Sequence, residues 1–169
     1  MRVELCEHAP VSGSAQERRF DAVGSCTWVR FVTDDGDEWA GVFGRGSMVD
    51  HVGAVLCGDG RTALIIAGGQ GYVVDAHAGT LHHKTACDTL CEAVAVPGRP
   101  WAIACDYTGL YAVSPQGELW RSPRLALDGI RLGQATGAAV AGEAWCHDGW
   151  RRFSVQFDGW RIDGDVLGE

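Results

Sequence analysis

The chain has 169 residues, of which 46% are hydrophobic, and a formal net charge of −8 at pH 7. This length and composition predict a single globular domain, residues 1–169, that can bury a core without disulfide bonds. The net negative charge disfavours binding to nucleic acid or to an anionic membrane, because both would repel the protein.

The N-terminal region contains one predicted strand, at residues 2–7, followed by a polar segment at 10–20 that we interpret as a flexible connection. It lacks the apolar core of a secretory signal. No later run approaches the roughly 18 apolar residues of a membrane helix. We therefore expect a cytoplasmic protein without a membrane segment.

The first predicted unit, residues 21–50, contains two clear strands within 27–43 on either side of an acidic turn. Its outer strand is not evident. The strand at 2–7 is a candidate to pair with the last unit instead and to close the assembly.

The next two units, 51–90 and 91–134, are copies of each other. Gly71–His82 (GYVVDAHAGTLH) recurs 38 residues later as Gly109–Trp120 (GLYAVSPQGELW), with glycines and apolar positions in register. Each copy contains four short runs that are separated by Gly, Pro or Asp, a pattern typical of strands and turns.

The last unit, 135–169, contains a shorter copy, RRFSVQFDGWRIDGDVLG. Gly159 takes the place of Gly109, and Asp163-Gly164 favours a two-residue hairpin turn. We interpret Asp148-Gly149 as the turn between the first and second strands of this unit.

Units of about forty residues with four strands each are typical of propeller blades. The third strand and its turn resemble the repeats of quinoprotein-type propellers, over about half of the chain and in blade geometry alone, so no quinone site is implied. We predict an all-β, propeller-like array of three to four antiparallel four-stranded units. A β-sandwich is the alternative, and the sequence leaves open whether the ring closes.

No motif predicts a metal, a cofactor or catalysis. His82 and His83 precede Cys87 and Cys91, but adjacent strand residues face opposite sides, which disfavours a four-ligand zinc site. The same geometry disfavours a nucleophilic pair at Cys146-His147. The seven cysteines are an odd number and their spacing matches no disulfide framework, which indicates reduced thiols.

Acidic and aromatic residues recur in the turns that we assign between second and third strands. If these turns emerge on one face, they form an acidic surface that would attract a basic protein, with aromatic anchors. The competing interpretation is that Asp is simply a good turn former. The predicted partner-binding residues are Asp34, Asp35, Asp37, Glu38, Trp39, Asp106, Tyr107, Asp158 and Trp160.

These features predict a non-enzymatic protein-binding module. Thirteen arginines and one lysine suggest a GC-rich bacterial genome. The specific hypothesis is a bacterial immunity protein that occludes a basic toxin or effector domain. One alternative is a small-ligand-binding or sensor propeller, although the predicted inner strands offer few polar groups at the axis. The other is an assembly scaffold.

Overall fold

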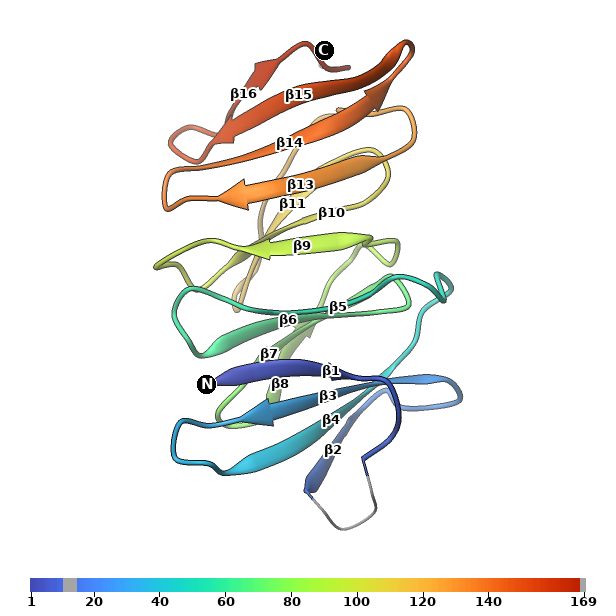
Figure 1. The fold of residues 1–169 in the computed structure, drawn as a ribbon, viewed down its shortest axis with the longest axis vertical. Coiled ribbons are helices and arrows are strands. Elements are labelled where there is room, and N and C mark those ends of the chain that lie inside the picture. Colours follow the sequence, from blue (N-terminus) through green and yellow to red (C-terminus); the bar gives the residue numbers. More distant parts are fainter. Residues whose placement is uncertain (11–14, 168–169) are drawn as a thin grey trace.

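The computed structural model describes residues 1–10 and 15–167. These residues form sixteen strands and no helix, arranged in four sheets of four strands each (Figure 1). Within this part of the chain, no helix is long and apolar enough to cross a bilayer. The predicted all-β class with three to four four-stranded units is confirmed, and the number of units is four. These four separate sheets exclude the alternative, a two-sheet sandwich.

The second and third sheets are antiparallel meanders in chain order and correspond to the two predicted copies. The second contains β5 (Val52–Leu56), β6 (Thr62–Ala67), β7 (Gln70–Asp75) and β8 (Thr80–Lys84), and the third contains β9 (Glu92–Ala95), β10 (Ala102–Cys105), β11 (Leu110–Ser114) and β12 (Gly117–Arg121).

An equivalent hydrogen bond confirms that these two sheets are copies, although it matches Gly71 with Leu110 and not, as the sequence register does, with Gly109. The Thr85 hydroxyl accepts from the Gly71 amide near the start of β7, and the Ser122 hydroxyl accepts from the Leu110 amide at the start of β11. In both copies a hydroxyl residue that follows the outer strand thus caps the third strand.

The fourth sheet begins earlier than predicted. It contains β13 (Ile130–Ala135), β14 (Ala139–Cys146), β15 (Gly149–Gln156) and β16 (Arg161–Gly164). The predicted boundary between 134 and 135 is therefore wrong, because β13 is the first strand of this sheet. Our interpretation of Asp148-Gly149 is also wrong, since this turn joins the second and third strands.

The first sheet departs from the meander, with the order β1-β3-β4-β2. Its strands are β1 (Arg2–Cys6), β2 (Gln16–Phe20), β3 (Cys26–Val32) and β4 (Glu38–Gly44). The strand predicted at 2–7 pairs antiparallel with β3, so it does not close the last unit.

Part of the predicted flexible connection is also a strand. β2 pairs with β4 in parallel, whereas residues 11–14 lie outside the described residues. Phe20 anchors β2 by stacking on Phe43, with the ring centroids 4.9 Å apart. This packing contact explains why a polar segment forms an edge strand.

The sheets stack face to face in an open arc, with the first and fourth sheets at opposite ends (Figure 1). The inner strands β1, β5, β9 and β13 are in contact in that order. A separate apolar core fills each of the three spaces between neighbouring sheets. The strands β6 and β10 are consequently buried along their whole length.

The two outward faces of the arc carry ion pairs. On the first sheet Arg30 pairs with Glu38 at 2.8 Å, and on the fourth Arg152 pairs with Glu143 at 3.9 Å. Arg131 lies over the ring of Trp150, 3.9 Å from its centroid. Such charged faces suit the ends of a stack of repeats, which are exposed to water.

The close approach of the β5–β6 and β9–β10 turns provides a test of the stacking. A Cβ atom at Gly58 would overlap the backbone of Val96 and Gly98, whereas one at Gly53 would lie an ordinary 3.7 Å from Ile66. Gly58→Ala should therefore lower the free energy of unfolding by about 1–3 kcal/mol in urea titrations. The matched control Gly53→Ala should change it by less than about 0.5 kcal/mol or stabilise the protein. Equal effects would contradict the described packing of the two turns.

Candidate functional site

The turns emerge at two opposite edges of the arc. We define the first edge by the turns β3–β4, β5–β6, β7–β8, β9–β10, β11–β12, β13–β14 and β15–β16, and the second edge by β6–β7, β10–β11 and β14–β15 (Figure 1). One contact shows that the irregular first sheet follows this assignment. The Trp39 indole N–H, beside the β3–β4 turn, donates to the Ala76 carbonyl at the start of the β7–β8 turn at 2.8 Å.

The structure divides the predicted partner-binding residues among three places. Asp34, Asp35, Asp37, Glu38 and Trp39 lie at the first edge on the first sheet. Asp158 and Trp160 lie at the first edge on the fourth sheet, at the other end of the arc.

Asp106 and Tyr107 lie at the second edge, in the β10–β11 turn. The predicted single acidic surface is therefore not formed. Two errors of strand order explain this outcome. Asp158 follows the third strand of its sheet and not the second, and the placement of β2 reverses β3 and β4 relative to β6 and β7.

Trp39 has a structural environment. It is 5% exposed, and its ring stacks on Phe31 with centroids 3.8 Å apart. Arg18 covers the ring, with its guanidinium carbon 5.4 Å from the centroid. Because its ring and its N–H are both occupied, Trp39 does not offer an anchor to a partner.

Asp106 is buried and holds the β10–β11 turn. Its carboxylate accepts hydrogen bonds from the amides of Thr108 and Gly109, both at 2.7 Å, and from the Tyr111 hydroxyl at 2.6 Å. Burial alone would raise the pKa of Asp106, but these hydrogen bonds outweigh it and hold the pKa below its ordinary value. The neighbouring Tyr107 hydroxyl pairs with the His51 ring at 2.7 Å.

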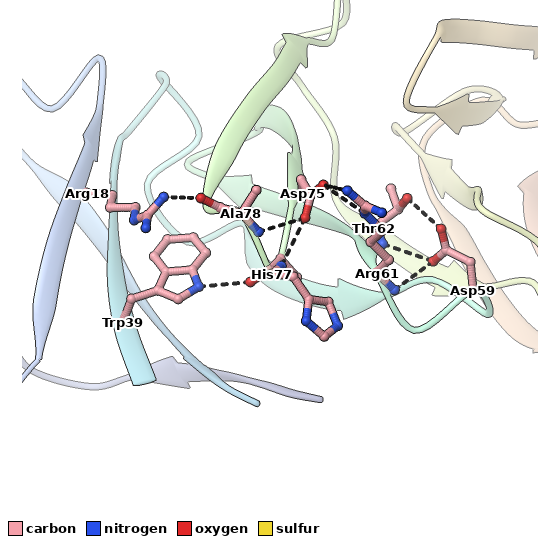
Figure 2. A network of polar contacts seen from close by, with 9 residues as sticks. Arg18, Trp39, Asp59, Arg61, Thr62, Asp75, His77 and Ala78 are labelled. Carbon is pink, nitrogen blue, oxygen red and sulfur yellow. Dashed lines mark hydrogen bonds and ion pairs between the residues drawn. The ribbon is translucent and has the colours of Figure 1, made fainter. Parts of the chain in front are cut away.

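A polar network reinforces the first edge of the second sheet (Figure 2). The Asp75 carboxylate pairs with Arg61 at 2.7 Å and accepts from the amides of His77 and Ala78. Asp59 accepts from the amides of Arg61 and Thr62. Since most of these bonds join carboxylates to backbone amides within the turns, the network stabilises the turns.

Four aromatic side chains gather at the first edge between the third and fourth sheets. All are half-buried, and Trp120 stacks on Trp160 with centroids 4.7 Å apart. Trp101 packs edge-on against Phe157 at 4.8 Å and lies 5.6 Å from Trp160. We call Trp101, Trp120, Phe157 and Trp160 the aromatic cluster. Sequence reasoning found Trp160 alone. Phe157 lies in the same turn, and Trp101 and Trp120 come from the third sheet.

The backbone of Trp160 marks this cluster as unusual. Its φ of 52° lies in the left-handed region, which a bulky side chain rarely adopts. Exposed Asp158 and Gly159 precede it in the same turn. The β15–β16 turn thus holds a tryptophan in a costly conformation beside an exposed carboxylate.

The remaining candidate residues show no assembled chemistry. Within residues 1–10 and 15–167, no group of three or more His, Cys, Asp or Glu side chains is placed to hold a metal ion. Burial raises the pKa of Cys57 to about 12 and that of Cys91 to about 11, which keeps both as neutral thiols.

Comparison with known proteins identifies the fold. The structure is similar to the WD40 domain of Neurospora crassa Pan2, with a TM-score of 0.53 and 9% sequence identity over 88% of this chain and 50% of that chain. A structure of Kuenenia stuttgartiensis hydrazine synthase aligns with a TM-score of 0.38 and 12% identity over 74% of this chain and 51% of that chain. The first similarity confirms the propeller-like arrangement of blades.

The chain spans about half the length of both solved structures. No protein-family model and no curated protein matches the sequence.

The buried Asp106 predicts a specific acid dependence. Because its pKa is depressed in the folded state, its stabilisation is present above the ordinary value near 4 and is lost as pH falls below it. Asp106→Asn should lower the free energy of unfolding at pH 7 by about 1–3 kcal/mol and flatten its dependence on pH below about 4. The exposed control Asp35→Asn should change stability at pH 7 by less than about 0.5 kcal/mol. An unchanged acid dependence in the Asp106 variant would contradict this role.

Proposed function

We propose that this protein is a non-enzymatic protein-binding module whose contact surface is centred on the aromatic cluster. The observation that supports this proposal most directly is the grouping of three tryptophans and a phenylalanine, all half-buried. One of these tryptophans, Trp160, has a positive φ. Tryptophan is strongly enriched among interface residues that dominate binding energy, and strained backbone often occurs at functional sites.

The surroundings of the cluster resemble the rim of an interface. The exposed β9–β10 turn contributes Arg99 between two prolines, and the β15–β16 turn contributes Asp158. An interface with aromatic residues at its centre and charged residues around them excludes water from the contacts that matter most.

A finer form of the proposal concerns the partner. The net charge of −8 favours encounter with a basic protein, which supports a bacterial immunity protein that occludes a basic toxin or effector domain. The predicted acidic residues lie in three separate places, so they do not form the contact surface in this proposal. The aromatic cluster takes that place, and charge contributes to the rate of encounter.

The test is binding to the product of the adjacent gene, co-expressed and purified. Trp160→Ala should weaken binding by about 30-fold or more in calorimetry, the loss typical of a central interface residue. Trp145→Ala is the matched control, because Trp145 is 39% exposed and lies on the outward face of the fourth sheet.

Thermal unfolding would show whether each variant remains folded. Asp158→Arg provides a second variant, and because Asp158 is exposed the substitution leaves the packing of the aromatic cluster intact. Equal losses for Trp160→Ala and Trp145→Ala would overturn the cluster as the contact surface. A neighbouring product without toxin character would overturn the immunity form.

A further inference from the structure

Tyr111, whose side chain packs in the core between the second and third sheets, borders two cavities. The first cavity, about 200 Å³, lies between the end of β8 and the strands β11 and β12. Cys87, Leu90 and Val113 contribute to its walls. Its lining is mainly apolar, which suits the hydrocarbon part of a small ligand.

The second cavity, about 280 Å³, shares Tyr111 with the first and is polar. Arg121 and Arg124 line it together with Thr108 and Ser122. A site where one tyrosine joins an apolar cavity to a cationic one has two chemically distinct ends.

Both guanidinium groups are held in place without a carboxylate. Arg121 lies over the Tyr111 ring, 5.0 Å from its centroid. Arg124 donates to the carbonyls of Ala126 and Leu127 at 3.0 and 3.1 Å. Among the described residues, neither arginine forms an ion pair, although acidic residues outnumber basic ones by 22 to 14.

We propose that the two cavities form one binding site for a small organic anion, with its apolar body beside Cys87 and Val113 and its carboxylate between Arg121 and Arg124. Guanidinium groups that are already oriented bind carboxylates strongly, because little side-chain entropy is lost. This site is separate from the aromatic cluster, so it extends the proposed function and does not depend on it.

The ends of β12 determine the orientation of the ligand. Glu118, near the start of the strand, lines the first cavity, whereas Arg121 is the last residue of the strand. A carboxylate near Glu118 would be repelled, and Lys84, which lines the same cavity, is already paired with Asp21 at 2.8 Å. The acidic group therefore lies at the Arg121 end. The Tyr111 hydroxyl donates to Asp106, and this bond fixes the ring that lines both cavities.

The affinity test uses 3-phenylpropionate as the probe, with the neutral 3-phenylpropanol and inorganic phosphate as comparison compounds. We expect saturable binding of phenylpropionate in calorimetry and much weaker binding of the other two. The double variant Arg121→Gln/Arg124→Gln should bind phenylpropionate about tenfold or more weakly. Arg99→Gln, an exposed arginine in the β9–β10 turn, is the matched control and should bind like the natural sequence.

Alkylation by iodoacetamide, followed by mass spectrometry, supplies an independent measurement. Saturating phenylpropionate should slow modification of Cys87 and leave Cys6 and Cys26 unchanged, because these half-buried thiols lie on the first sheet. This measurement reports on the apolar cavity without any substitution in the chain.

Three results would overturn the proposal: no saturable binding of phenylpropionate, equal affinity for phenylpropanol, or binding without protection of Cys87. Tight binding of phosphate without protection of Cys87 would reduce the site to the arginine pair and would also overturn it. None of these results bears on the partner complex, which is measured with Trp160→Ala.

Discussion

The structure depends on the burial of apolar sheet faces against one another. β6 and β10 have water on neither side, because each lies between two neighbouring sheets. Large side chains such as Leu64 and Ile66 meet the small Ala102 and Ala104 across the space between the second and third sheets. This complementarity brings the sheets close enough for the turns to contact one another. The outward faces of the first and fourth sheets, which have no such neighbour, bear ion pairs instead.

The stacking also determines which residues share an edge, since strand direction decides where each turn emerges. The second and third sheets could be predicted from sequence, because their glycine spacing and short apolar runs mark every strand. The strands of the fourth sheet could not be assigned in the same way. β13 (IRLGQA) carries exposed Arg131 and Gln134 and does not resemble a buried strand. When the first strand of a sheet is missed, every later turn of that sheet is assigned to the opposite edge. For this reason Asp158 was grouped with Asp106.

The chemical role of a turn residue is still harder to predict than its position. Asp106 and Asp158 occur in similar sequence contexts, yet Asp106 is buried with its carboxylate bonded to four donors, whereas Asp158 is exposed. The turn after Asp158 lacks counterparts of Thr108 and Tyr111, and it joins the third and fourth strands of its sheet instead of the second and third. The aromatic cluster presents the same difficulty, because Trp101 and Trp160 meet only when the third and fourth sheets are stacked.

Tyr111 connects the structural and the proposed functional features of the third sheet. Burial and the hydrogen bond to Asp106 both raise the pKa of Tyr111, so its hydroxyl stays protonated and remains a donor. With the hydroxyl held by Asp106, the ring lies beneath the Arg121 guanidinium and lines both cavities. A carboxylate selected from sequence as a partner contact therefore acts from inside the fold, where it positions the aromatic ring on which the anion site would be built. Its contribution to binding is indirect, through the orientation of Tyr111 and the guanidinium group above it.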